Sequence, residues 1–186
     1  MPPKVKVTKD EIVKTSVDII RSNGVQALNA RAIASALNCS TQPIFSNFAS
    51  MEELQLAAVR KADELYQSYI QREIASKQFP SYKASGMAYI RFAKDENELF
   101  KLLFMRDRSK SADTFGDDSF DDMVSFVQSY TGLNEADAKL FHLELWAFVH
   151  GIATMFATGF LDLDWELVSK MISDAYFGLR KRYGME

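Results

Sequence analysis

The chain contains little of the chemistry on which enzymes and disulfide-stabilised proteins depend, with one cysteine and two histidines among 186 residues. Cys39 has no partner for an intramolecular disulfide, and residues 1–9 are polar and basic rather than apolar, so we expect a cytoplasmic protein. The sequence also lacks a Glu-x-x-His pair, a glycine-rich phosphate loop and a nucleophile elbow. We therefore expect no enzymatic activity, no metal site and no cofactor.

An excess of positive charge, which is usual in nucleic-acid-binding proteins, is absent, since the net charge is -3. The charge is nevertheless unevenly distributed along the chain. Residues 1–50 contain six basic and three acidic side chains, which leaves this part at +3 and the remainder at -6. This asymmetry favours a small DNA-facing module attached to a larger acidic body.

Strand-like alternation, internal repeats and linkers rich in proline or glycine are also absent, whereas apolar residues recur at helical spacing. The sequence therefore predicts an all-α fold. Capping boxes are predicted at Thr8 with Glu11 and at Ser50 with Glu53. The expected helices cover residues 8–23, 50–77, 81–93, 96–105, 119–130, 134–158 and 164–183, with two short helices between the first and the second.

Residues 145–161 contain no Asp, Glu, Lys or Arg, and their length is at the lower limit for a membrane span. The segment also contains two glycines, two threonines and a histidine, and it has acidic rather than basic flanks. We interpret it as a helix that is buried in protein.

Residues 29–48 have the pattern of a helix-turn-helix motif. Asn29 and Ser40 are suitable N-caps for its two short helices, and Asn38 in the turn is a residue type that tolerates a left-handed backbone. Pro43 falls in the first turn of the second helix, where a missing N–H costs little. A small core for the motif is predicted from Ile33, Leu37, Cys39, Ile44 and Phe48.

With this motif the sequence resembles the TetR family of transcriptional regulators. The family pattern has a first helix that ends in Gly, then R-x-I-A, then V-S-x-x-x-L-Y-x-x-F-x-S-K-x-x-L. The matching residues here are Gly24, Arg31, Ile33, Ala34, Cys39, Ser40, Ile44, Phe45, Phe48, Ser50 and Leu54. Two positions depart from the pattern, because Phe45 replaces the usual Tyr and Met51 the usual Lys, and each change removes a group of the kind that contacts phosphate.

The resemblance implies an N-terminal three-helix helix-turn-helix domain, residues 1–50, joined by the long helix to a helical effector-binding and dimerisation domain, residues 51–186. It further implies a homodimer that binds double-stranded operator DNA. The resemblance favours a repressor that a small, largely apolar effector releases from its operator.

In such a motif the second helix enters the major groove of DNA and its early residues meet base edges. Gln42 is the leading candidate base reader because its amide can bond N6 and N7 of adenine together, and Arg31 is a candidate phosphate clamp. The candidate DNA contacts are Lys4, Lys6, Arg31, Ser40, Thr41, Gln42, Phe45, Ser46 and Asn47. The polar members of this set would also suit a solvated turn.

The remaining helices suggest a dimer surface and an effector pocket. The candidate dimer residues are a small-residue stripe, Ala147, Gly151, Thr154 and Thr158, and an apolar stripe on the last helix, Trp165, Val168, Ile172 and Tyr176. The candidate pocket residues are Phe92, Phe100, Phe104, Phe126, Tyr130, His142, Trp146 and His150. Each histidine would also suit a role in a protein core or an interface.

A helical ligand-binding or adaptor module that has lost operator binding is the alternative function. Phe45, Met51 and the lack of any Lys or Arg between residues 32 and 59 make it conceivable. A mobility shift at two salt concentrations distinguishes the two functions.

Overall fold

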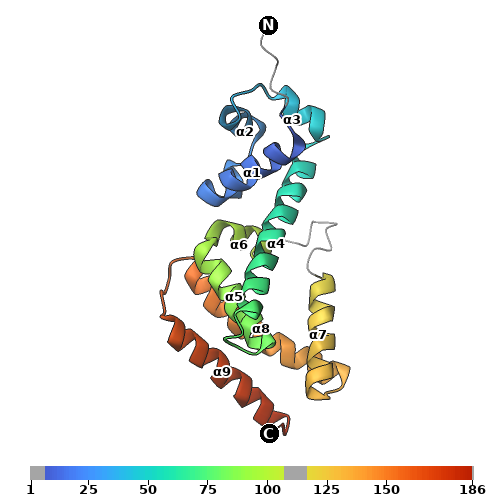
Figure 1. The fold of residues 1–186 in the computed structure, drawn as a ribbon, viewed down its shortest axis with the longest axis vertical. Helices are drawn as coiled ribbons and strands as arrows, with labels where there is room; N and C mark the ends of the chain where they lie inside the picture. The colour runs from blue at the N-terminus through green and yellow to red at the C-terminus, as the bar shows by residue number, and fades with distance from the viewer. Residues whose placement is uncertain (1–6, 107–116, 186) are drawn as a thin grey trace.

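The structure is a computed structural model that describes residues 7–106 and 117–185 (Figure 1). These residues form nine α-helices and one short 3₁₀ turn, and they contain no strand. In chain order the elements are α1 (Lys9–Asn23), η1 (Val25–Ala27), α2 (Ala30–Ala36), α3 (Gln42–Asn47), α4 (Met51–Ala75), α5 (Ser81–Asp95), α6 (Asn97–Phe104), α7 (Asp117–Thr131), α8 (Glu135–Ala157) and α9 (Trp165–Arg182). The predicted all-α fold is confirmed.

The first helix has the ends that its sequence predicts. The backbone N–H of Glu11 donates to Oγ1 of Thr8 (3.2 Å), while the Glu11 carboxylate accepts the N–H of Thr8 (2.8 Å), which completes a capping box. Gly24 ends the helix with a φ of +77°, a conformation that costs glycine little. These two ends set the length of α1 and direct the chain back towards α2.

The predicted capping box at the start of α4 is only half formed. The N–H of Glu53 donates to Oγ of Ser50 (3.2 Å), as expected. The carboxylate of Glu53, however, reaches one residue further back and accepts the N–H of Ala49 (2.7 Å) instead of that of Ser50.

The three N-terminal helices and the start of α4 share one hydrophobic core. Its buried members are Ile12, Ile33, Ala34, Ile44, Phe48 and Leu54. Removing a side chain of this size from water contributes about 1.5 to 3 kcal/mol. Because Leu54 belongs to this core, the start of α4 is fixed to the helix-turn-helix unit. From there α4 runs into the body, as Figure 1 shows.

The body is arranged around α5 and α8, which pack against each other at its centre. Its larger core includes buried residues from α4, α5, α6, α8 and α9. Among the described residues α8 is the one helix long and apolar enough to cross a membrane. Ala138, Phe141, Leu145, Ile152 and Ala153 of α8 are buried in the protein, so packing accounts for part of the apolar character of this helix, and 44% of its most apolar stretch is buried.

Candidate nucleic-acid interface and effector core

The turn between α2 and α3 has the predicted geometry. Asn29 caps α2 by accepting the N–H of Ala32 at 2.9 Å, and Asn38 has a φ of +50°. The N–H of Cys39 then donates to the carbonyl of Ala34 (2.9 Å). The left-handed backbone of Asn38 and the hydrogen bond from Cys39 close the turn and fix the direction in which α3 leaves it.

The prediction that Ser40 caps the second helix of the motif is wrong. Helix α3 begins at Gln42 and its N-cap is Thr41, which makes no side-chain capping bond. Thr41 already has helical dihedrals (φ -72°, ψ -13°), so its carbonyl accepts from Ile44 and Phe45 while its hydroxyl is not directed at the first turn. Pro43 lies in the first turn, as predicted.

The candidate DNA contacts differ in how free their side chains are. Arg31, Ser40, Gln42, Phe45 and Ser46 are exposed, while Thr41 and Asn47 are half-buried. The Ser46 hydroxyl donates to the carbonyl of Gln42 (2.9 Å), and the Asn47 amide donates to the carbonyl of Pro43 (2.8 Å). Lys4 and Lys6 lie outside the described residues. Apart from Ser46, the polar candidates that are exposed are therefore Arg31, Ser40 and Gln42.

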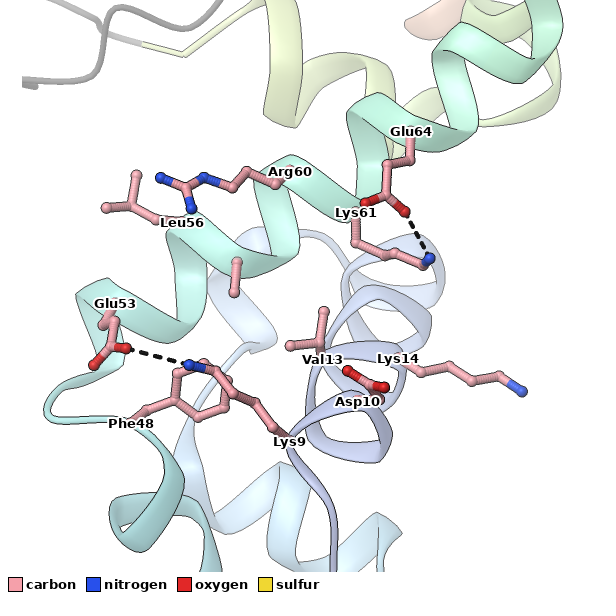
Figure 2. A pocket seen from close by; sticks show the side chains of 11 residues that line it. Lys9, Asp10, Val13, Lys14, Phe48, Glu53, Leu56, Arg60, Lys61 and Glu64 are labelled. Carbon is pink, nitrogen blue, oxygen red and sulfur yellow. Dashed lines mark hydrogen bonds and ion pairs between the residues drawn. The ribbon is translucent and has the colours of Figure 1, made fainter.

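A groove of about 540 Å³ lies between α1 and α4, beside the helix-turn-helix unit (Figure 2). Nζ of Lys9 is 3.6 Å from Oε1 of Glu53 and lies 4.6 Å from the centre of the Phe48 ring. Further along the groove, Lys61 and Glu64 form an ion pair of 2.7 Å on α4. Part of the positive charge near the helix-turn-helix unit is thus paired within the protein.

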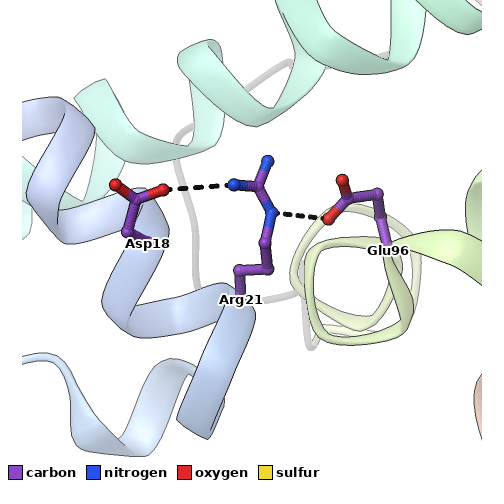
Figure 3. Close-up of polar contacts among 3 residues, drawn as sticks. All are labelled: Asp18, Arg21 and Glu96. Carbon is purple, nitrogen blue, oxygen red and sulfur yellow. Dashed lines mark hydrogen bonds and ion pairs between the residues drawn. The ribbon is translucent and has the colours of Figure 1, made fainter.

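A second polar contact joins the helix-turn-helix unit to the body. Nε of Arg21, near the end of α1, lies 2.7 Å from Oε2 of Glu96, the residue between α5 and α6, and its Nη1 lies 3.1 Å from Asp18 (Figure 3). Beside it, a β-carbon placed on Gly24 would lie 2.9 Å from the carboxylate of Glu98. The end of α1 is therefore held close to the start of α6.

The candidate pocket residues fall into two groups rather than one. The first group is continuous: the Phe100 ring packs on Phe104 (5.2 Å between centroids) and on His150 (5.9 Å), and Trp146 stacks on His150 (5.0 Å). Phe92 joins it through Tyr66 (5.3 Å). These residues come from α4, α5, α6 and α8.

The second group lies between α5, α7 and α8. Phe126 stacks on Tyr82 (6.2 Å) and on Tyr130 (6.3 Å), and the Tyr82 hydroxyl is hydrogen-bonded to Nδ1 of His142 (2.9 Å). Phe126 and Tyr130 are 39% and 62% exposed. The expectation of a single cluster is therefore wrong for this group, because the helical stripe on α8 is long enough to face two separate cores.

Each histidine makes the same type of contact with α5. His150 is hydrogen-bonded through Nδ1 to the Tyr89 hydroxyl (2.8 Å), as His142 is to Tyr82. Burial lowers the pKa of both histidines and raises the pKa of both tyrosines, because the charged forms lose hydration. The neutral forms are favoured, and both pairs join α5 to α8.

Part of the predicted set of dimer residues on α8 and α9 is wrong. Val168 and Ile172 are 0% and 5% exposed, so they pack inside the protomer and are not available to a partner. Trp165 stacks on Phe156 (5.6 Å) and Tyr176 packs on Phe141 (5.8 Å), and both are half-buried. The apolar stripe on α9 thus packs against the body of the same protomer. Helical periodicity alone does not show whether such a stripe faces the protomer core or a partner.

The residues of α8 and α9 that face outward are different from the buried residues of the α9 stripe. On α8 the stripe of Ala147, Gly151, Thr154 and Thr158 is exposed or half-buried. Large apolar side chains are also exposed beside it and on α9, namely Leu140, Leu143, Trp146, Phe148, Leu167 and Phe177. The hydroxyls of Thr154 and Thr158 donate to carbonyls within α8 (2.8 Å each), so the stripe presents little free polar chemistry.

Sequence reasoning missed several residues of these sites. Tyr82 and Tyr89 are seven residues apart on α5, close to the eight-residue spacing of the two histidines on α8, and both spacings correspond to about two helical turns, a signal that was available in the sequence. Arg21 and Glu96 are 75 positions apart. No local pattern connects them, so only the structure could reveal that contact.

A helix-turn-helix unit carried on an α-helical body is an architecture of transcriptional regulators. The family described as "Tetracyclin repressor-like, C-terminal domain" matches residues 82–174, which is half of the chain. The chain belongs to the TetR family of transcriptional regulators.

Solved structures share this fold at low sequence identity. A protein of unknown function from Rhodococcus sp. RHA1 has a TM-score of 0.75 at 21% identity, covering 97% of this chain and 98% of its own. A TetR-like transcriptional regulator from the same organism has a TM-score of 0.70 at 14% identity, covering 99% of each chain. A TetR family protein from Vibrio parahaemolyticus has a TM-score of 0.64 at 15% identity, covering 91% of this chain and 97% of its own. No curated protein matches the sequence.

Proposed function

We propose that this protein is a homodimeric, DNA-binding repressor of the cytoplasm that a small, largely apolar effector releases from its operator. Residues 1–50 bind DNA in this proposal, and residues 51–186 bind the effector and dimerise. The observation that carries it is the exposed Gln42 at the start of α3, presented by a helix-turn-helix unit whose own core is fully packed. Family membership supports the same conclusion.

DNA binding is tested by two substitutions with different expected effects. Gln42→Ala should weaken binding to a selected operator more than binding to random DNA, because it removes a base contact worth roughly 1 to 3 kcal/mol. Arg31→Ala should weaken both equally and reduce the dependence of affinity on salt, because it removes a phosphate contact. Fluorescence anisotropy on both DNAs measures this. Equal losses for Gln42→Ala would exclude Gln42 as a base reader.

Dimerisation through α8 is supported by its stripe of small residues and by the exposed apolar side chains around it. Ala147→Glu places a charge at one end of this stripe, beside the exposed Leu143 and Phe148, and should convert dimers to monomers in light scattering. Gln71→Glu adds the same charge at an exposed position of α4 and should leave the dimer intact. A dimeric Ala147→Glu variant would exclude this surface.

Effector release is supported by the position of α6. Phe100 and Phe104 of this helix belong to the first aromatic group, while Glu96 and Glu98 at its other end contact the end of α1. An effector that separates the aromatic rings would displace α6 and, with it and α4, the helix-turn-helix unit. An effector acts only through its preference for one conformer over the other. Unchanged operator affinity across a broad screen of apolar compounds would contradict this.

A second function, a helical ligand-binding or adaptor module without operator binding, is favoured by one observation. The exposed face of α3 carries Phe45 and no basic residue, since Lys and Arg are absent between residues 32 and 59. Mobility shifts of the full chain on random and selected DNA at two salt concentrations separate the functions, because an adaptor would select no sequence.

A further inference from the structure

The outward face of α3 carries one large apolar side chain that the fold leaves uncovered. Phe45 is 53% exposed, whereas the adjacent Ile44 is fully buried and Phe48 is 2% exposed. Within residues 7–59 the other large apolar side chain that is exposed is Leu56 (39%), which lies on α4 beside the groove of Figure 2. Phe45 is therefore the principal apolar feature of the surface that α3 presents.

The polar side chains around Phe45 have fewer free hydrogen-bonding groups than the sequence suggests. The donors of Ser46 and Asn47 are engaged by carbonyls of α3 itself. Gln42 remains exposed one turn before Phe45, and residues three apart on a helix lie side by side on one face. An amide and an aromatic ring thus form the centre of the exposed surface of α3.

Phe45 has no hydroxyl and so cannot donate a hydrogen bond to phosphate. A phenyl ring in the major groove makes favourable contact with one group on the base edges, the 5-methyl group of thymine. We propose that Phe45 is a specificity-determining residue that selects thymine by packing against this methyl group, beside the base pair that Gln42 contacts. This inference rests on the proposed operator binding.

The size of the effect follows from the area that the contact removes from water. One buried methyl-sized group contributes about 0.8 kcal/mol, which corresponds to about a fourfold change in affinity. Because a dimer reads two half-sites, loss of the methyl group from both should lower affinity about sixteenfold.

The experiment uses the full chain and an operator that it selects from random DNA. Each thymine is replaced in turn by deoxyuridine, which lacks only the methyl group, and the affinity of each duplex is measured by fluorescence anisotropy. We expect one thymine in each half-site to show about a fourfold loss and the other thymines to show little change. In Phe45→Ala the affinities for thymine and deoxyuridine at that position should become equal.

Two further variants keep the result interpretable. Phe45→Tyr retains the ring, so it should retain the methyl dependence even if Phe45→Ala folds poorly. Leu56→Ala removes the other exposed apolar side chain and should leave the methyl dependence unchanged. A selected operator that shows no methyl dependence at any thymine overturns the inference, as does methyl dependence that survives in Phe45→Ala. If no operator is selected at all, the proposed function fails and the inference fails with it.

Discussion

The contact between Arg21 and Glu96 gives a prediction whose size can be worked out from burial. The Arg21 side chain is 42% exposed, but that of Glu96 is only 14% exposed. Exposed ion pairs contribute about 0.2 to 1 kcal/mol, while a largely buried charged group that loses its partner costs about 1 to 3 kcal/mol. Since the Arg21 side chain is partly in water, we expect Arg21→Ala to lower the free energy of unfolding by about 1.5 kcal/mol, in the lower half of the second range.

A double-mutant cycle of Arg21→Ala and Glu96→Ala, followed by urea denaturation, isolates the ion pair between α1 and the junction of α5 and α6. We expect a coupling energy of about 1 kcal/mol, and a fall in the melting temperature of roughly 3 to 6 °C for Arg21→Ala in a chain of this length. The matched control is the pair of Lys61 and Glu64, which has the same 2.7 Å separation but side chains that are 55% and 67% exposed. Its coupling should stay below about 0.5 kcal/mol. Equal coupling in the two cycles would refute the reasoning from burial.

Three further predictions concern Gly24, Asn29 and the pair of histidines. Gly24→Ala should destabilise the chain by about 1 kcal/mol or more, measured by urea denaturation, because alanine is strained at φ +77° and its β-carbon would meet Glu98; an unchanged midpoint would contradict this. Asn29→Ala should cost about 1 kcal/mol through loss of the cap on α2, with Asn29→Ser as the control that restores it. His142 and His150 have pKa values lowered in the folded chain, so the unfolded chain binds more protons just below pH 6.5, and the stability that they contribute is present above that pH and is lost as the pH falls. His142→Gln with His150→Gln should therefore reduce the loss of stability between pH 7.5 and pH 5.5, and an identical pH profile in wild type and variant would exclude these histidines as its source.

The sequence was sufficient for several of the interactions that are local. Thr8 with Glu11, Asn29 with Ala32 and the left-handed Asn38 involve residues within four positions of one another, and the structure has them as predicted. The capping error at Ser40 arose at the same scale, since Ser40 and Thr41 are both acceptable caps and the backbone of Thr41 decided between them.

The sequence was not sufficient where one helix has a choice of partners. The stripe of Val168 and Ile172 identifies an apolar face of α9, but the same pattern suits a protomer core or a dimer interface. His142 has helical spacing with Trp146 and His150 of the first aromatic group and yet packs in the second. Periodicity locates a face of a helix, and only tertiary packing decides what covers it.

Helix α6 connects the proposed effector core to the proposed DNA-binding unit, so the two are expected to respond together. It has eight residues, so a rigid shift caused at Phe100 or Phe104 reaches Glu96 and Glu98 within about two turns. At that end the carboxylate of Glu96 pairs with Arg21, and that of Glu98 lies against Gly24. The Arg21 end of α1 is buried in the body core through Val17 and Ile20, while Ile12 near its start belongs to the core that supports α3. If this route carries the effector's influence, Arg21→Ala should weaken the effect of a bound effector on operator affinity while leaving the affinity for the effector itself nearly unchanged. A variant that loses the Arg21 contact and still releases DNA fully on effector binding would place the coupling in α4 instead.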